Sequence, residues 1–261
     1  MDDAPLPLYE HDAQRTRANR ERLHGNRNLL LWYERLYQEL FRDVPDIASR
    51  RILEIGSGTS PLKGFLPNVL TSDVLALDYL DLVFDCHRID ELAQVPDGGL
   101  DIITLTNVLH HLRDPLLFLR RATRKLAPGG SVYLVEPYFS ALSWPLYKLL
   151  HPEPVDFSVR SPMLDAVAGP LSSANQAIPH MLFFRRADWL GELADVYDLE
   201  RTRVDHYTSL AYMATGGISR TFSVPHALFR RWLAADIMLA RRWPSLFASF
   251  FCARLTTPEA A

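Results

Sequence analysis

The sequence has few cysteines and no long apolar run. Cys86 and Cys252 are the two cysteines among 261 residues, too few for a disulfide framework, which favours a reducing compartment. No uninterrupted apolar stretch approaches the roughly 18 residues that a membrane-spanning helix needs. The first residues, MDDAPLPLYEHD, are acidic and lack the apolar core of a signal peptide. These absences predict a cytoplasmic protein without a membrane span.

An excess of one charge sign is also lacking. Lys and Arg number 28, Asp and Glu number 31, and the formal net charge is −3. This balance gives no general attraction to nucleic acid, so no nucleic-acid partner is expected. No Cys/His group has the spacing of a zinc site, and no carboxylate set for magnesium follows the strand expected at 100–107, so no metal is expected. The oligomeric state stays open, a homo-oligomer included.

From residue 51 onward, short apolar runs alternate with helical segments. A helix is expected after Asp114, which can cap it, with Pro115 in its first turn. Buried strands interleaved with helices favour a parallel, doubly wound α/β sheet. Five runs read as its strands: RRILEI, NVLTSD, LDLVFD, LDIITLTN and SVYLVEP.

The two ends of the chain have a different pattern. Apolar residues at helical spacing predict an amphipathic helix over 27–44, and residues 1–26 are polar and expected to begin irregularly. Residues 138–185 are rich in proline without a regular period, which indicates an insertion. A helix at 185–194, a strand at 199–208, a long helix at 225–243 and a last strand at 248–256 should follow. The fold expected is a Rossmann-like sheet of about seven strands, mostly parallel, with a late antiparallel strand and helices on both faces.

The stretch RILEIGSGTSP, residues 51–61, places two glycines directly after a buried strand. Gly56 and Gly58 let the backbone pass close to a ligand at the carboxyl end of the sheet. The third glycine of a dinucleotide fingerprint would fall at Pro61, which disfavours an NAD-dependent oxidoreductase. Glu54 would repel a pyrophosphate and would suit a ligand with a cation, unless it simply pairs with Arg51.

Other strand ends carry further polar residues. Asp73 ends the second expected strand, Asp85 and Cys86 follow the third, and LTNVLHHLRDP and LAPGGSVYLVEP surround the fourth and fifth. With these motifs, residues 51–137 resemble the class I S-adenosylmethionine-dependent methyltransferases, in particular the type 11 family of small-molecule methyltransferases. The resemblance implies S-adenosylmethionine as the cofactor.

The resemblance also implies cofactor-binding roles for ten residues at four strand ends. They are Glu54, Gly56, Ser57 and Gly58 near the methionine part, Asp73 at the ribose with Val74 beside the adenine, Asp85 and Cys86 at the adenine edge, and Asn107 and Val108 under the sulfonium. Asp78 and Asp81 stand close enough in the sequence to compete with Asp73, because the second crossover is short.

Three histidines are the candidates for catalysis. His110 and His111 follow the fourth strand, and His151 lies in the insertion, as does His180. A histidine there could deprotonate a hydroxyl or amine acceptor. The competing interpretation is that one of the pair only packs a turn beside Asp114.

The expected organisation is an N-terminal helical lid over 1–45 and a methyltransferase domain over 46–261, with a substrate-capping insertion at about 138–185. The expected activity is methyl transfer to a small or medium-sized acceptor, such as a natural product, a sugar or a lipid-linked compound, at an oxygen, nitrogen or carbon atom. An RNA or protein methyltransferase, or an S-adenosylmethionine binder repurposed for a non-methylating reaction, are the alternatives.

Overall fold

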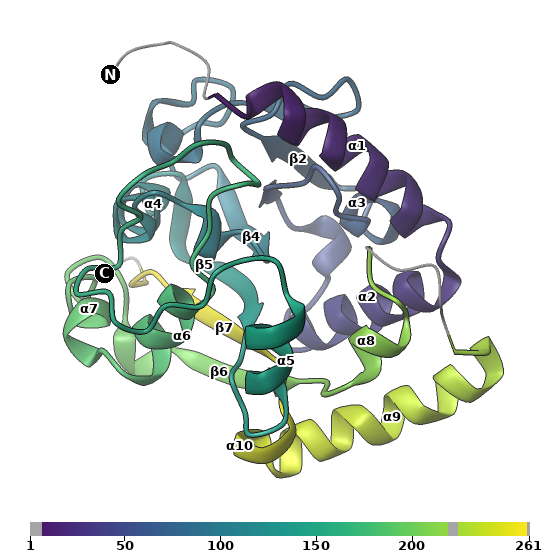
Figure 1. The fold of residues 1–261 in the computed structure, drawn as a ribbon. Helices are drawn as coiled ribbons and strands as arrows, with labels where there is room; N and C mark the ends of the chain where they lie inside the picture. The colour runs from purple at the N-terminus through teal and green to yellow at the C-terminus, as the bar shows by residue number, and fades with distance from the viewer. Residues whose placement is uncertain (1–6, 219–223, 260–261) are drawn as a thin grey trace.

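One seven-stranded sheet forms the centre of the computed structural model, which describes residues 7–218 and 224–259 (Figure 1). Neighbouring strands are parallel, except that β7 is antiparallel to both β5 and β6. This confirms the Rossmann-like sheet and its late antiparallel strand. In spatial order the strands are β3 (Leu82–Val83), β2 (Val69–Asp73), β1 (Ile52–Ile55), β4 (Leu100–Thr106), β5 (Leu126–Pro137), β7 (Phe250–Thr256) and β6 (Arg203–Tyr207).

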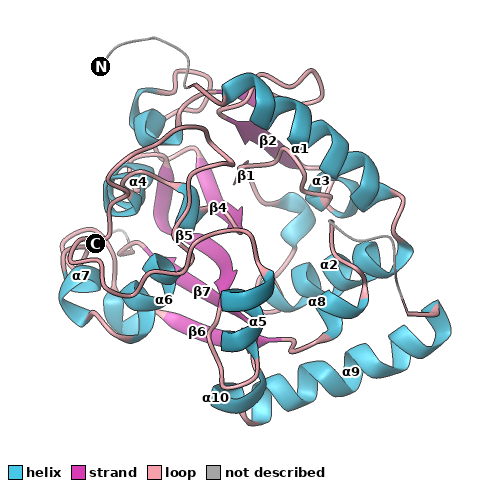
Figure 2. Ribbon diagram, viewed as in Figure 1, coloured by secondary structure: helices cyan, strands magenta, loops and turns pink. Residues whose placement is uncertain are grey.

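Helices cover both faces of this sheet (Figure 2). The α-helices are α1 (Tyr9–His24), α2 (Arg27–Leu40), α3 (Leu62–Phe65), α4 (Pro115–Ala122), α5 (Ser143–Leu150), α6 (Ala177–Phe184), α7 (Ala187–Gly191), α8 (Ala211–Ala214), α9 (His226–Arg242) and α10 (Pro244–Phe247). Short 3₁₀ turns are η1 (Ile47–Ser49), η2 (Cys86–Glu91), η3 (Leu109–His111) and η4 (Leu199–Arg201). Asp114 caps α4 as expected, because its Oδ1 accepts a hydrogen bond of 2.9 Å from the Leu117 amide.

The alternation of side chains along each strand divides the core into two layers. Leu53 and Ile103 point to the layer that contains α4, α6 and α7, whereas Ile52 and Ile102 point to the layer that contains α2, α8 and α9. The apolar stripe of α2 is buried as its spacing predicts, and Trp32 on it is fully buried. β2 and β3 follow β1 in the sequence and extend the sheet in one direction, whereas β4 lies on the other side of β1. The order of the strands therefore reverses between β1 and β4. In open α/β sheets such a reversal marks the ligand site.

Two helical segments were not expected from the sequence. The polar residues 9–24 form α1, which has no apolar period because its buried face carries Asp12, Ala13 and Thr16 as well as Leu23. The segment 138–185 contains α5 and α6. Residues 177–182 of α6 are all buried, and a helix buried on all sides has no apolar stripe to reveal it.

α1 is fastened to the segment 138–185 by a buried carboxylate. Oδ2 of Asp12 accepts hydrogen bonds of 2.9 Å from the amides of Leu171 and Ser172, and the Ser172 hydroxyl donates to Oδ1 at 2.5 Å. A Cβ added to Gly169 would lie 2.3 Å from Asp12 Oδ2, so only glycine permits this approach. Two segments about 160 positions apart therefore meet at one edge of the sheet.

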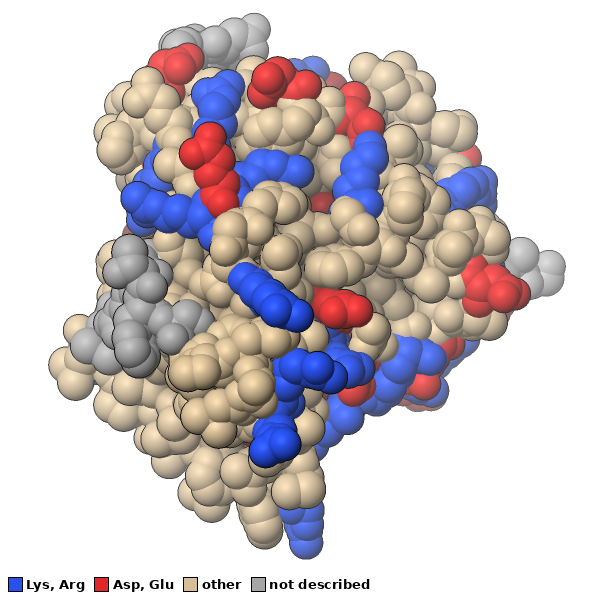
Figure 3. Space-filling view, turned by 90° about the vertical axis from the view of Figure 1, so that its right-hand side faces the viewer, with Lys and Arg blue, Asp and Glu red and all other residues tan. Residues whose placement is uncertain are grey.

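Surface charge is mixed in the part of the chain that the structure describes. Figure 3 shows acidic side chains interspersed among the Lys and Arg side chains of one face. Arg42 lies 2.8 Å from Asp205 and Lys63 lies 2.5 Å from Asp81, which illustrates this pairing. None of the described helices combines the length and the apolar character needed to cross a membrane.

We expect Asp12→Ala to lower the free energy of unfolding by about 1.5–3 kcal/mol, because the bonds lost are made to a charged group. Glu10→Ala, on the exposed side of the same helix, is the control and should change it by less than about 0.5 kcal/mol. Chemical denaturation measures the difference, and proteolysis should become faster within 164–173. Equal stability of the two variants would contradict the fastening role of Asp12.

Candidate active site

The glycine turn after β1 touches the turn after β4. Gly56 has a φ of +73°, and a Cβ added to it would lie only 2.4 Å from a methyl carbon of Val108. Asn107 adopts a φ of +56°, a left-handed conformation that asparagine tolerates better than most residues. The hydroxyl of Ser57 fixes the turn by donating to the Glu54 carbonyl at 3.1 Å and accepting from the Ser72 amide at 3.1 Å. The backbone is thereby held close to the point where the strand order reverses.

Glu54 is a buried carboxyl beside this turn. Its Oε1 accepts a hydrogen bond of 2.5 Å from the Ser60 hydroxyl, and its Oε2 has no hydrogen-bond partner. Burial raises the pKa of Glu54 to about 7. The alternative pairing with Arg51 is wrong, because the Arg51 guanidinium lies 3.2 Å from Asp101 instead.

Asp73 is the acid whose position suits a ribose. Its two carboxylate oxygens accept hydrogen bonds of 3.0 Å, one from the Gly58 amide and one from the Leu75 amide. Burial raises its pKa, although these bonds act in the opposite direction. Asp81 faces elsewhere and is held by Lys63 and by the amide and hydroxyl of Thr71. Asp78 is exposed.

The residues at this edge fit S-adenosylmethionine. Glu54 Oε2 and Asn107 Oδ1 are buried oxygens without partners, and such acceptors suit the ammonium group of the methionine part. Asp73 would accept from the ribose hydroxyls, and Val74, with 37% of its surface exposed, offers an apolar surface beside it. The roles of these residues are predictions that the geometry supports.

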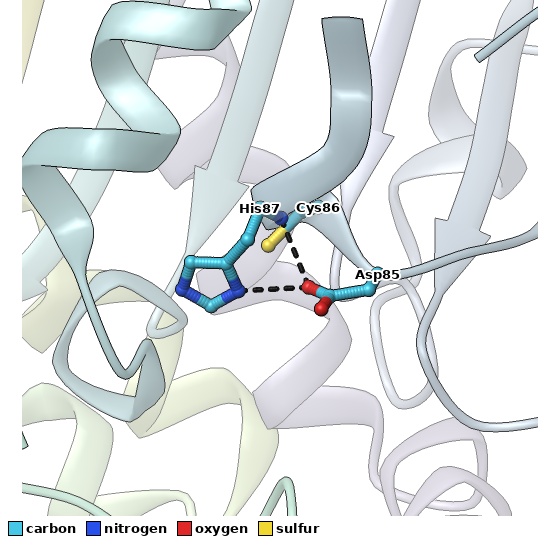
Figure 4. A group of neighbouring side chains, drawn as sticks. All are labelled: Asp85, Cys86 and His87. Carbon is cyan, nitrogen blue, oxygen red and sulfur yellow. Dashed lines mark hydrogen bonds and ion pairs between the residues drawn. The ribbon is translucent and has the colours of Figure 1, made fainter. Parts of the chain in front are cut away.

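Asp85, Cys86 and His87 form a group at the start of η2 (Figure 4). Asp85 Oδ1 accepts from the His87 amide at 2.9 Å and lies 2.7 Å from its Nδ1, while His87 Nε2 accepts from the Asp114 amide at 3.2 Å. Both ring nitrogens are thus engaged, so this group ties η2 to α4 and leaves no imidazole lone pair for a metal. Burial raises the pKa of the Cys86 thiol. Contact of Asp85 and Cys86 with an adenine stays a prediction.

His110 is fixed between two carboxylates at the carboxyl end of β4. Its Nδ1 lies 2.5 Å from Glu136 Oε2, and its Nε2 lies 3.2 Å from Glu153 Oε2. Glu136 Oε1 also accepts from the Val108 and Leu109 amides at 3.0 and 2.7 Å. Burial lowers the pKa of His110, but the two glutamates more than offset this and raise it to about 10.

His111 lies beside His110, with ring centroids 4.2 Å apart. Its Nδ1 donates to the Ser173 carbonyl at 2.8 Å, so the neutral ring presents the lone pair of Nε2, which lies 3.7 Å from Glu153 Oε1. Burial, reinforced by the charge of His110, lowers the pKa of His111 to about 4. His111 is therefore neutral at physiological pH.

The other two histidines of the segment 138–185 differ in position. His151 reaches the edge of the His110–His111 cluster, where its Nδ1 accepts from Gln176 Nε2 at 2.7 Å, so the neutral ring carries its proton on Nε2. His180 lies apart among aromatic rings, and burial lowers its pKa to about 4.

Glu136 and Glu153 belong to the site although neither was singled out from the sequence. Glu136 is the residue before the final proline of the motif LVEP, which closes β5, and a charged residue near the end of an otherwise apolar run is the signal that could have found it. Glu153 follows His151 in HPEP, inside an irregular segment whose path the sequence does not reveal.

Comparison with known proteins now gives the family. A family model described as "Methyltransferase domain" matches residues 23–200, more than half of the chain. The chain belongs to this methyltransferase domain family. By family and fold it is a class I methyltransferase, with S-adenosylmethionine as its cofactor.

Individual relatives of this methyltransferase are distant. The ubiquinone biosynthesis O-methyltransferase of Xanthomonas oryzae pv. oryzae is 26% identical over 105 residues, which cover 34% of this chain and 44% of that protein. The protein of the same name from Neisseria meningitidis serogroup A is 21% identical over 105 residues, which again cover 34% of this chain and 44% of that protein. The chain thus spans 44% of the length of these curated relatives.

Two solved structures align with most of the chain. An S-adenosylmethionine-dependent methyltransferase from Archaeoglobus fulgidus aligns with a TM-score of 0.46 at 16% identity, covering 86% of this chain and 94% of its own. A putative methyltransferase from Haloferax volcanii, solved with the Trm112 activator, aligns with a TM-score of 0.49 at 13% identity, covering 98% and 100%.

We expect Asp73→Ala to weaken S-adenosylmethionine binding by about 1.5–3 kcal/mol, the range for hydrogen bonds to a charged group. Isothermal titration calorimetry measures the dissociation constant. Asp78→Ala is the matched comparison and should bind normally. The reverse result, normal binding by Asp73→Ala and weak binding by Asp78→Ala, would move the ribose to the other acid.

Cofactor affinity should also depend on pH through Glu54. With a pKa of about 7 in the free protein, Glu54 is protonated below that pH, whereas an ammonium group binds the ionised form. Affinity should therefore rise with pH by up to about tenfold per unit below about pH 7 and then level off. Glu54→Gln should bind more weakly and without this dependence. An identical pH profile for both proteins would exclude Glu54 from the ammonium site.

Proposed function

We propose that this methyltransferase methylates a hydroxyl oxygen of a small or medium-sized, largely apolar acceptor. The observation that carries the proposal is the convergence of His110, His111 and Glu153 directly after the Asn107–Val108 turn. The cofactor is expected on one side of that turn, and the cluster lies on the other. A polar cluster next to the reacting methyl group is needed when the acceptor must lose a proton, as a hydroxyl must.

The segment 138–185 provides the surroundings of the acceptor in this proposal. Its amide at Asn175 donates to the His110 carbonyl at 2.9 Å, which holds the segment over η3. Phe139 packs against four rings at centroid distances of 5.2 to 5.7 Å, those of Trp144, Tyr147, Phe157 and His180. Tyr147 lies 5.7 Å from the His151 ring, so the aromatic group reaches the edge of the polar cluster. Apolar walls with a few polar groups are typical of small-molecule sites.

S-adenosylmethionine, when bound, would supply an electrophilic methyl group for the acceptor oxygen, with its sulfur as the leaving atom. The chain's own tasks are to position the acceptor, to exclude water and to ionise the hydroxyl. In this proposal His110 holds Glu153 in place. The neutral His111 and the ionised Glu153 accept the hydrogen bond, and then the proton, of the acceptor hydroxyl. His151, with its proton on Nε2, would donate to a second oxygen of the acceptor.

Oxygen is preferred to nitrogen or carbon for two reasons. The cluster contains several groups that bind or accept protons, which an already nucleophilic carbon or an amine that is already unprotonated would not require. The ubiquinone biosynthesis enzymes that the chain resembles are O-methyltransferases by name. A natural product, a sugar or a lipid-linked compound with a free hydroxyl meets these requirements.

A turnover assay tests this proposal against its alternatives. The protein is incubated with S-adenosylmethionine and panels of phenols, alcohols, sugars and amines, and S-adenosylhomocysteine and methylated product are measured by mass spectrometry. Methylation of a hydroxyl supports the proposal. Methylation of amines, RNA or protein alone would overturn it, as would tight cofactor binding with conversion of an acceptor but no methyl transfer.

We expect His111→Ala and Glu153→Gln each to lower kcat by roughly 10²–10⁴-fold, the usual contribution of acid–base groups. The dissociation constant for S-adenosylmethionine should stay within a few-fold, because neither residue belongs to the cofactor edge. Glu91→Gln, an exposed change on η2, serves as the control and should keep full activity. Full activity in either cluster variant would remove that residue from the proposed chemistry.

A further inference from the structure

We propose that His110, His111 and Glu153 bind one divalent transition-metal ion, with Zn²⁺ as the first candidate. Each residue offers one ligand atom, and the three atoms lie within 4.8 Å of one another. Two imidazoles and one carboxylate, with a further position left open, form the ligand set of catalytic zinc sites. From the sequence no metal is expected, because no Cys/His group has the spacing of a zinc site; Glu153 joins the histidine pair only in the folded chain.

The spacing of the ligand atoms matches such an ion. His110 Nε2 lies 3.2 Å from Glu153 Oε2, and His111 Nε2 lies 3.7 Å from Glu153 Oε1. Two ligands at about 2.1 Å from a tetrahedral ion are about 3.4 Å apart. The side chains therefore need only small shifts to enclose the ion.

The hydrogen bonds behind the ligands give the second, independent argument. A metal-binding histidine almost always donates its other N–H to a carboxylate or a backbone carbonyl. Nδ1 of His110 is bonded to the Glu136 carboxylate, and Nδ1 of His111 is bonded to the Ser173 carbonyl. Glu153 is oriented as well, because Gln176 Nε2 donates to its Oε2 at 2.8 Å. Both rings thus direct Nε2 toward the same carboxylate.

The lone pairs and negative charges of this cluster favour a bound cation. His111 directs a lone pair toward Glu153 Oε1, and two acceptors that face each other repel. Glu136 adds a second buried carboxylate behind His110. A protonated His110 can donate to both Glu136 and Glu153. His111 Nε2 and Glu153 Oε1 would still face each other with no donor between them. A divalent ion between the three atoms satisfies all of them.

The role of the ion rests on the proposed function and changes one part of it: with the ion bound, His111 and Glu153 act on the acceptor hydroxyl through the ion and not by direct contact. The acceptor hydroxyl would occupy the open position, where the ion lowers its pKa. The O–H bond then breaks, its electron pair stays on the oxygen, and the proton leaves to water on the side where His151 is partly exposed. The ion is neither oxidised nor reduced.

The experiment uses the full chain after treatment with a chelator. Zn²⁺ is titrated calorimetrically, and Co²⁺ is followed by its visible absorption bands, which report nitrogen and oxygen ligands without any turnover. The proposal expects one equivalent of each metal. It also expects His111→Ala and Glu153→Gln to lose the Co²⁺ bands while they bind S-adenosylmethionine normally, which shows that they are folded.

Two further variants sharpen the assignment. Glu136→Gln keeps all three ligands and should weaken Zn²⁺ binding by roughly 10–100-fold, the usual effect of removing a hydrogen bond behind a ligand. His87→Ala changes the Asp85–Cys86–His87 group and should leave one equivalent bound, which places the ion at the first cluster.

The outcomes separate this inference from the proposed function. Absence of Zn²⁺ and Co²⁺ binding in a protein that methylates a hydroxyl would overturn the metal site and leave the O-methyltransferase assignment intact. Metal binding that survives both His111→Ala and Glu153→Gln would overturn it too. Metal bound by the three residues in a protein that methylates no hydroxyl would support the site and refute the proposed function.

Discussion

The carboxylate of Glu136 is the constraint on which the arrangement of the active edge depends. It stands at the end of β5, yet it accepts hydrogen bonds from the Val108 and Leu109 amides and from the His110 ring in the turn after β4. A buried charge is stable only when such donors surround it. The turn that supplies them is therefore held in one conformation, which fixes both the Val108 contact with Gly56 and the orientation of His110.

Two chemically different halves meet at that turn. Toward β1 and β2 lie two acids that accept hydrogen bonds, the buried Glu54 and the partly buried Asp73, at the positions predicted for an ammonium group and a diol. Toward β5 lie the histidines and Glu153, beneath a group of aromatic rings. The segment 138–185 contacts both the second half, through His110, and helix α1, through Asp12. The segment 138–185 thus links helix α1 to the turn after β4.

The sequence predicted the parts of this structure that depend on local pattern. Strands with apolar runs, the Asp114 cap and the glycine turn at Gly56 are each specified by neighbouring residues, and the motifs at the strand ends indicated the family. The sequence did not reveal α6, because a helix buried on every side lacks a period, or α1, because Asp12 and Thr16 lie on its buried face. Glu153 was missed for another reason. Its place beside His110 is set by tertiary contacts across an irregular segment, which no local spacing encodes.

The position of β7 has a consequence for the order in which the molecule can be assembled during synthesis. β7, the last strand along the chain, pairs with β5 on one side and β6 on the other, and β6 has no other partner in the described sheet. Until residues 250–256 leave the ribosome, β5 exposes an open edge, and the 203–207 segment has nothing to pair with. Open edges attract strands of other chains. The nascent polypeptide must therefore wait, with one edge of β5 unprotected, for a segment that is made after all the other strands of the described sheet.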